Sequence, residues 1–416
     1  MCPEFIGGTY SYIYELGRRL AAKGHSIDMI VSTRTYEDGS VEDLDGIRVH
    51  RYTFRRVHPA YSTAQHLRNT YAAFQEIHSR EPVDLIGIHD THLGLKTATS
   101  ALGRSICQIP TYHAPSFLEY RFDTERKLEA EPSPLRRAVT RMGALPLERM
   151  QWRFERGVLR AADGILVLSR YTRGHIERNF PDVDTGKVKI IPSGVDIERF
   201  SPAEDRASVR ESLGFASDSI QLLSVRRLAP RMGLGNLIRA IALVRGGDAP
   251  GADRVNLTIC GRGELMESLK SLASELGISE HVDLAGRVLD EDLDRHYKAA
   301  DLFVLPTTDL EGFGISTVEA LSANLPVVGT PAGATPEILG QIDERLLTED
   351  TSSEAIAAAI CRWLRWRDED GGTTRYRDFA VENYAWDDVA DRVEEYYSSE
   401  ISSFRKRRDG DRLTGG

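Results

Sequence analysis

The chain has 416 residues, of which 41% are apolar and 28% are charged, and its formal net charge at pH 7 is −10. This length predicts two domains of about 200 residues each, and the acidic balance argues against general nucleic-acid binding, which requires a basic face. No stretch approaches the ~18 apolar residues of a membrane span, and the N-terminus lacks the basic and apolar regions of a secretory signal. We therefore expect a cytoplasmic protein.

Apolar strands and amphipathic helices alternate along the first half of the chain. Residues 10–23 place apolar side chains at helical spacing, and Gly24 ends this helix. Strands are predicted after it at 26–32, 46–52, 84–90, 108–114, 164–169 and 188–195. This alternation predicts an α/β protein whose parallel sheets are covered by helices on both faces.

Residues 192–202 are predicted to link two domains, because two prolines and a glycine interrupt the periodicity there. A second series follows, with strands at 219–225, 255–261, 281–286, 301–306 and 325–330 and helices at 235–244 and 264–277. We therefore assign an N-terminal domain to residues 1–196 and a C-terminal domain to residues 197–384.

The end of the chain combines a helical stretch with a basic tail that ends in glycines. We expect the helix, residues 385–401, to cross back to the N-terminal domain, and the tail, residues 402–416, to be disordered. Ligands of doubly wound domains bind beyond the carboxyl ends of the strands, where loops lead into helices. Functional residues are therefore sought in those loops.

The segment 310–330 carries the most informative pattern in the chain. Glu311 and Glu319 are separated by seven residues, and a Gly-Phe-Gly sequence at 312–314 lets the backbone pass close to a ligand. A helix that begins near Ser316 directs free N–H groups toward an anion. The pattern suits a nucleotide-sugar, with its diphosphate at the helix N-terminus and carboxylates on its hydroxyl groups. The alternative is a capped helix preceded by a flexible loop.

This segment resembles the Glu-x7-Glu signature of retaining glycosyltransferases with the GT-B fold, family 4 in particular. Further segments resemble motifs of that family in the same order, at 3–32, 162–176, 188–202, 224–241, 257–277 and 281–288. The resemblance covers nearly the whole chain and implies two Rossmann-like domains that face each other across a cleft. It also implies the transfer of a hexose from a UDP- or GDP-sugar to a glycan, lipid or small-molecule acceptor, by front-face attack and without a metal or other cofactor.

The resemblance assigns roles in the C-terminal half by position. Glu319 is implied to hold the ribose of the donor, and Glu311 to lie near the transferred sugar. Arg227 is implied to neutralise the donor phosphates, which suits a guanidinium because charge builds on the leaving diphosphate. The other implied donor contacts are Gly261, Arg287, Val288 and the backbone of Phe313, Gly314 and Ile315.

One position departs from the family pattern. The family has a lysine just before a glycine as a second cation on the diphosphate, whereas this chain has Met232 before Gly233. Arg231 is adjacent, and we expect it to reach the same phosphates. The alternative is that donor binding is weakened.

In the N-terminal half, Gly7 and Gly8 resemble a pair that approaches the donor diphosphate. His113 resembles a histidine near the transferred sugar, where an imidazole can hydrogen-bond the sugar and help order the acceptor. The catalytic residues are thus predicted to be His113, Glu311 and Arg227. His89, Asp90 and His92 also follow a strand, and we interpret them as acceptor-side residues rather than metal ligands.

Residues 136–160 are rich in arginine with apolar side chains between. One interpretation is a helix on a membrane surface, which would place the enzyme near a lipid acceptor and hold it as a peripheral protein at the inner face. The other is an ordinary helix that buries Trp152 and Phe154 and leaves its arginines in water. Interruptions at Gly143 and Pro146 favour the second interpretation.

Two rival functions stay open on the same fold. One is a non-catalytic protein that binds a nucleotide-sugar or a partner, and Met232 favours it. The family also begins with an apolar strand before the Gly-Gly loop, and this chain starts almost at that loop; either the coding sequence extends upstream, or another segment fills a central slot in the N-terminal sheet. The other rival is a nucleotide-sugar epimerase, which would form product without an acceptor.

Overall fold

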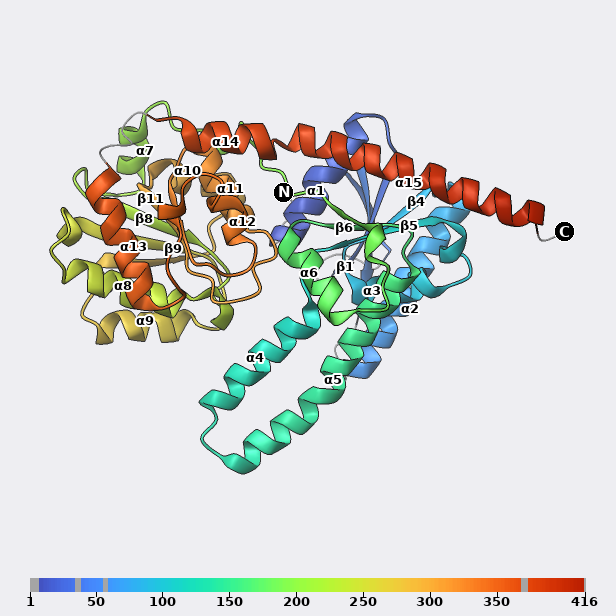
Figure 1. Ribbon diagram of the computed structural model, residues 1–416, viewed down its shortest axis with the longest axis horizontal. Helices are drawn as coiled ribbons and strands as arrows, with labels where there is room; N and C mark the ends of the chain where they lie inside the picture. Colours follow the sequence, from blue (N-terminus) through green and yellow to red (C-terminus); the bar gives the residue numbers. More distant parts are fainter. Residues whose placement is uncertain (1–6, 34–38, 55–58, 368–372, 415–416) are drawn as a thin grey trace. The chain divides into compact units, whose positions relative to one another are not determined.

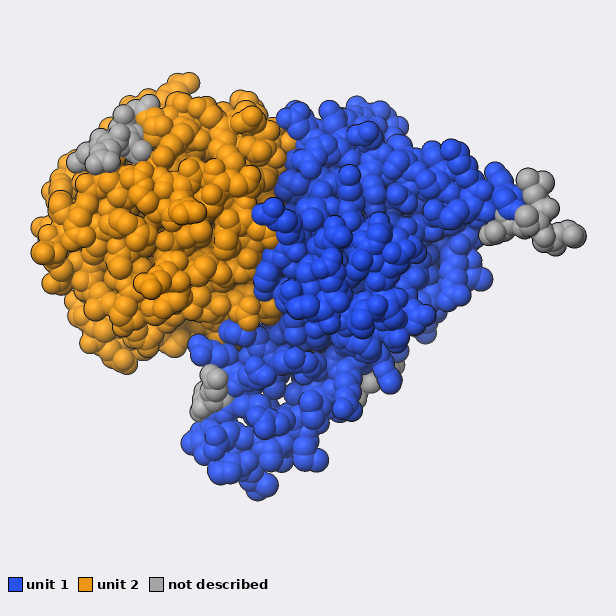
Figure 2. Space-filling view, viewed as in Figure 1, with its two compact units in different colours: residues 1–192, 387–416 blue, residues 193–386 orange. Residues whose placement is uncertain are grey.

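The computed structural model describes residues 7–33, 39–54, 59–367 and 373–414 (Figure 1). The chain divides into two compact units, coloured separately in Figure 2. The first unit consists of residues 1–192 together with 387–416, and the second consists of residues 193–386.

The first unit contains two sheets. One has the order β1-β3-β2, in which β1 (Ile27–Thr33) and β3 (Ile47–Thr53) are parallel and β2 (Val41–Leu44) is antiparallel. The other is parallel and consists, in this order, of β4 (Leu85–Ile88), β5 (Cys107–Tyr112), β6 (Ile165–Val167) and β7 (Val188–Ile190). Among the described residues, β1 and β4 each pair with a strand on one side only. The short, largely exposed β2 was not predicted, because its Val-Glu-Asp-Leu sequence lacks a buried apolar face.

Six helices of the first unit precede or connect these strands. They are α1 (Gly8–Ala22), α2 (Pro59–Arg80), α3 (Thr91–Thr99), α4 (Ser116–Ala130), α5 (Pro134–Ala161) and α6 (Arg170–Asn179). Helices α4 and α5 form a hairpin that extends away from the sheets (Figure 1). The inner half of α5 is anchored, because Trp152 stacks on Phe180 with ring centroids 6.0 Å apart and Phe154 meets the edge of His92 at 5.9 Å.

The C-terminal helix corrects one prediction. Helix α15 runs from Trp386 to Thr414, so the tail expected to be disordered from residue 402 is helical through Thr414. Its basic side chains have partners in the first unit: Arg405 pairs with Asp84 at 2.5 Å and Arg407 with Asp163 at 3.0 Å. Composition alone indicated disorder because these acidic partners lie far away in the sequence.

The second unit is built on one parallel sheet with the order β10-β9-β8-β11-β12. Its strands are β8 (Ile220–Val225), β9 (Val255–Cys260), β10 (Val282–Gly286), β11 (Leu302–Leu305) and β12 (Val327–Gly329). Its helices are α7 (Arg206–Ser212), α8 (Leu234–Arg245), α9 (Met266–Glu275), α10 (Asp290–Ala299), α11 (Ile315–Ser322), α12 (Thr335–Leu339), α13 (Ser353–Trp366) and α14 (Arg375–Tyr384). The predicted α/β class with parallel sheets is confirmed.

Helix α8 shows why these segments fold as they do. Its apolar residues recur at intervals of three and four, and the stripe that they form is fully buried. The residues of this stripe are Leu234, Leu237, Ile238, Ile241 and Val244. Strand β11, by contrast, is buried at every position, as expected for a central strand covered on both faces.

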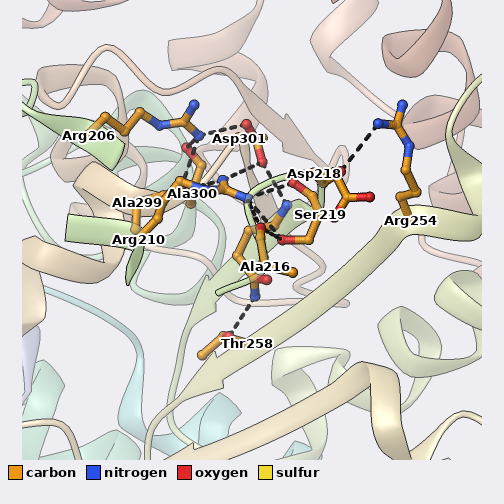
Figure 3. Close-up of polar contacts among 11 residues, drawn as sticks. Arg206, Arg210, Ala216, Asp218, Ser219, Arg254, Thr258, Ala299, Ala300 and Asp301 are labelled. Atoms are coloured by element: carbon orange, nitrogen blue, oxygen red, sulfur yellow. Dashed lines mark hydrogen bonds and ion pairs between the residues drawn. The ribbon is translucent and has the colours of Figure 1, made fainter. Parts of the chain in front are cut away.

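The amino-terminal edge of this sheet is closed by a buried arginine of α7 (Figure 3). Arg210 donates to Asp301 at 3.0 Å and to the carbonyl of Ser219 at 2.7 Å. Asp301 also accepts the backbone N–H of Gln221 at 2.7 Å and a guanidinium N–H of Arg206 at 2.6 Å. The network joins α7 to the starts of β8 and β11, so it stabilises the sheet at the edge opposite the loops that follow the strands.

Candidate functional site

The loops after the strands of the second unit share one edge of the sheet, because all five strands are parallel. The chain passes from β8 outward through β9 and β10 on one side, and then continues with β11 and β12 on the other side. The strand order therefore reverses between β8 and β11. Open α/β sheets bind their ligands outside the carboxyl ends of the strands at such a point.

Glu311 lies in the loop after β11 and is buried. Its carboxylate accepts a guanidinium N–H of Arg226 at 2.5 Å and the hydroxyl of Thr307 at 3.0 Å. The backbone is held as well, because Ala334 N–H donates to the carbonyl of Glu311 at 2.8 Å. A Cβ atom at Gly333 would come within 2.2 Å of that carbonyl oxygen. The carboxylate is thus fixed from two sides before any ligand arrives.

Arg226 is the residue that sequence reasoning missed. Its Nη2 atom contacts the Thr307 hydroxyl and the sulfur of Met232, each at 2.9 Å, as well as Glu311. Its side chain is 8% exposed, and its buried Nε atom has no hydrogen-bond acceptor within the described part of the chain. The guanidinium therefore keeps one unsatisfied N–H group beside Glu311.

The two arginines named from the sequence take different positions. Arg227 is exposed at the carboxyl edge, and its side chain makes no hydrogen bond or ion pair with the residues that the structure describes. Arg231 is buried and donates to the carbonyl of Leu310 at 3.1 Å, so it braces the loop that carries Glu311. The cation that contacts Met232 is Arg226, whereas the expected contact of Arg231 with the donor phosphates stays a prediction.

Helix α11 carries the second glutamate of the motif. Gly314, with φ at +94°, occupies its N-cap without a side-chain cap. The backbone N–H groups of residues 313–316 have no acceptor within the described residues, which leaves a positive helix end open to an anion. Glu319 accepts the hydroxyl of Tyr297, a buried residue of α10, at 2.6 Å. Tyr297 therefore orients this carboxylate, and no signal in the sequence indicated it.

The remaining donor residues named from the sequence lie along the same edge. Gly261 has φ at +152°, and a Cβ atom there would stand 1.7 Å from the carbonyl oxygen of Arg226. The glycine therefore lets the loops after β8 and β9 approach each other closely, and this contact fixes the backbone position of Arg226. Arg287 is exposed and Val288 half-buried in the loop after β10, and the side chain of Phe313 is buried in the core.

In the first unit, Gly7 is the N-cap of α1 and Gly8 is its first residue. His113 follows β5, and its Nε2 atom lies 3.1 Å from Nδ1 of His89. The edge of the His113 ring meets the ring of buried Tyr12 at 5.2 Å. Burial lowers the pKa of His89 to about 4 and the pKa of His113 well below its usual range. Both imidazoles are therefore neutral near pH 7 and act as hydrogen-bonding groups.

His89, Asp90 and His92 point to different partners although they are close in sequence. Asp90 caps α3 by accepting the backbone N–H groups of His92 and Leu93. His92 contacts Phe154, and His89 contacts His113. Within the described residues, no group of three or more histidine, cysteine, aspartate or glutamate side chains converges as metal ligands would.

Family models match both halves of the chain. A model of Glycosyltransferase Family 4 matches residues 6–199, and a model of Glycosyl transferases group 1 matches residues 205–371. The chain belongs to the family 4 glycosyltransferases. The second model contains every site residue of the second unit described above, and this family 4 glycosyltransferase has the GT-B fold.

Known proteins resemble this family 4 glycosyltransferase over different lengths. The GDP-mannose-dependent alpha-(1-6)-phosphatidylinositol monomannoside mannosyltransferase of Mycolicibacterium smegmatis is 32% identical over 233 residues, which are 54% of this chain and 59% of the relative. The D-inositol 3-phosphate glycosyltransferase of Geodermatophilus obscurus is 26% identical over 85% of this chain and 77% of its own length. The solved sucrose-phosphate synthase from Thermosynechococcus elongatus gives a TM-score of 0.75 at 21% identity, covering 95% of this chain and 94% of that one.

The match to the mannosyltransferase thus spans about three fifths of that relative. Across the described residues of the family 4 glycosyltransferase, no helix combines the length and the apolar character needed to cross a membrane.

Proposed function

We propose that this chain transfers a hexose from a nucleotide-diphosphate sugar to a glycan, lipid or small-molecule acceptor, with retention of configuration and without a metal or other cofactor. The observation that carries the proposal is the pairing of the largely buried side chain of Arg226 with buried Glu311 beside the open N-terminus of α11. A cation, a helix dipole and two fixed carboxylates then lie at the point where the strand order reverses.

Each of these residues has its own role in donor binding or catalysis. The N–H groups at the start of α11 bind the diphosphate, and the exposed guanidinium of Arg227, with Arg226 behind it, adds positive charge where the leaving group gains negative charge. Glu319, oriented by Tyr297, accepts hydroxyl groups of the ribose. Glu311, held between Arg226 and Thr307, keeps a fixed carboxylate for the transferred sugar, and a preorganised group of this kind needs no rearrangement during reaction.

A lipid-linked acceptor is supported by a relative. The mannosyltransferase of Mycolicibacterium smegmatis is named for GDP-mannose as donor and a phosphatidylinositol monomannoside as acceptor. We propose an acceptor of the same broad class, a glycan or a lipid that carries sugar, and we propose that neutral His113 hydrogen-bonds the transferred sugar on the acceptor side. The proposed donor nucleotide carries either uracil or guanine as its base.

The test measures both donor binding and sugar transfer. Purified protein is screened by thermal shift against UDP-, GDP- and ADP-sugars, because a ligand that binds only the folded form raises the melting temperature. The sugar that gives a shift is then supplied in radiolabelled form with membrane lipid extract, with and without EDTA. Glu319→Ala should abolish the shift, whereas Glu275→Ala, which removes an exposed carboxylate of α9, should keep it.

The outcomes separate the candidate functions. Transfer of label that resists EDTA supports the proposal, and loss of transfer in EDTA contradicts its metal-free part. A shift without transfer or hydrolysis supports the non-catalytic alternative, which Met232 favours in the sequence. Conversion of the sugar without an acceptor supports an epimerase. No shift with any of the donors, or full affinity in Glu319→Ala, refutes the site.

A further inference from the structure

The outer part of the α4–α5 hairpin, which extends away from the sheets in Figure 1, carries a concentrated apolar surface. Eight large apolar side chains are exposed among the described residues, and four of them lie within eleven positions of α5. They are Leu135, Val139, Met142 and Leu145, which are 74%, 63%, 73% and 46% exposed. Their spacing of four, three and three places them on one face of the helix.

Unpaired arginines surround this face. No acidic residue occurs between Glu131 and Glu148, although the whole chain has a net charge of −10. Five arginines of this part of α5 form no ion pair within the described residues. They are Arg136, Arg137, Arg141, Arg149 and Arg153. Nearer the sheet, by contrast, Arg156 and Arg160 both pair with Asp182.

The two halves of α5 therefore differ in packing and exposure. The inner half is held by Trp152 and by the buried carboxylate of Glu155, whereas residues 134–143 are exposed at every position. Beside the boundary, a surface hollow is lined by Pro146, Arg149, Met150, Arg153 and Phe154. Arg149 and Arg153 stand one turn apart in it, next to apolar side chains, which suits a phosphate attached to an acyl chain.

We propose that the exposed side chains of α5 between Leu135 and Arg153 dock on the surface of an anionic phospholipid membrane. The apolar face enters the boundary between headgroups and acyl chains, and the arginines bind lipid phosphates while their stems lie along the apolar region. Charge complementarity identifies the partner, since a basic, acid-free helix end on an acidic protein matches a negatively charged lipid surface. The inference does not rest on the transfer reaction, because docking needs neither donor nor acceptor.

The test is sedimentation of the full chain with vesicles. One set contains phosphatidylcholine alone, and the other contains phosphatidylcholine with phosphatidylglycerol. Binding is expected on the anionic vesicles only, and it should weaken as salt is added because surface charge is screened. Leu135→Ser/Val139→Ser/Met142→Ser should reduce vesicle affinity at least tenfold. Its control is Leu243→Ser/Leu276→Ser, which removes exposed apolar side chains of the second unit.

A second pair of variants tests the charges. Arg136→Gln/Arg137→Gln/Arg141→Gln should weaken binding to anionic vesicles by roughly fivefold for each arginine lost. Its control is Arg104→Gln/Arg239→Gln/Arg392→Gln, which makes the same change in net charge at exposed positions elsewhere. Circular dichroism should be unchanged in all four variants because every substituted side chain is exposed.

Several results would overturn the inference. These are no sedimentation of the wild type with anionic vesicles, equal binding to neutral vesicles, or hairpin variants that bind like their controls. Failure to bind vesicles combined with self-association that the apolar variant abolishes would assign the face to a second copy of the chain. Donor thermal shifts should be the same in all variants, so failure of docking is distinguishable from failure of the proposed function.

Discussion

The carboxylate of Glu155 gives the sharpest test of how the hairpin is anchored. Glu155 lies on α5 and is 0% exposed. It accepts the hydroxyl of Tyr112 at 2.5 Å and the backbone N–H of Phe117 at 3.1 Å. Because Tyr112 ends β5 and Phe117 lies in the first turn of α4, one side chain joins the sheet to both helices of the hairpin.

Burial raises the pKa of Glu155 from 4.5 to about 7, although its hydrogen bonds to Tyr112 and Phe117 act in the opposite direction. Since the folded pKa lies above the unfolded pKa, the folded state binds more protons between these values. The stabilisation is therefore complete below pH ~4.5 and is lost as the pH rises through about 7. A shift of this size corresponds to about 3 kcal/mol of unfolding free energy.

Replacing Glu155 with glutamine tests this effect, because the carboxamide keeps the shape of the side chain and one accepting oxygen but does not ionise. Unfolding in urea, followed by far-UV circular dichroism, is measured for both proteins at a series of pH values between about 4 and 9. Relative to Glu155→Gln, the wild type should lose about 3 kcal/mol of stability over this range. Glu125→Gln, at an exposed position of α4, serves as the control. A wild-type-minus-variant difference that stays constant with pH, or rises with it, would refute the reasoning.

Three further variants test the second unit. Arg226→Gln leaves Glu311 buried without its cation, so we expect a loss of about 3 kcal/mol in stability and at least a hundredfold loss in kcat/KM. In the double variant Arg226→Gln/Glu311→Gln, melting curves should show that the stability is recovered, while the activity stays low. Tyr297→Phe removes the hydroxyl that orients Glu319, and steady-state kinetics should show a donor KM roughly tenfold higher. Arg210→Met breaks the network around Asp301, so urea titration should show about 3 kcal/mol of destabilisation with kcat unchanged.

Features of this protein that depend on residues close together in the sequence were predictable from sequence patterns. Buried parallel strands appear as short apolar runs, so the strands of the second unit were recognisable along the chain. The spacing of Glu311 and Glu319 also lies within a single strand–loop–helix segment. The structure places both residues on the loop and helix that follow β11, as that spacing predicts.

Features that depend on distant contacts were not predictable. Arg226 and Arg227 are neighbours of the same type, and only the position of Glu311, 85 residues away, distinguishes the buried one from the exposed one. The tail of α15 was judged by its composition, but Arg405 meets an acid 321 residues away. In α5, periodicity allowed a packed helix or a surface helix, and the structure shows that the inner and outer halves differ.

The contact between Arg226 and Met232 bears on whether this chain is an active enzyme. A lysine at 232, as the family pattern has, would bring a second cation against Arg226, whose Nη2 atom lies 2.9 Å from the Met232 sulfur. Two unit charges that close repel by on the order of 5 kcal/mol at an effective dielectric constant near 20. An arginine at 226 and an uncharged side chain at 232 are therefore compatible with each other, whereas a second cation there would meet this repulsion, which the carboxylate of Glu311 offsets in part. The exposed Arg227 still offers an unpaired cation at this edge among the described residues, so the methionine does not by itself favour a non-catalytic protein.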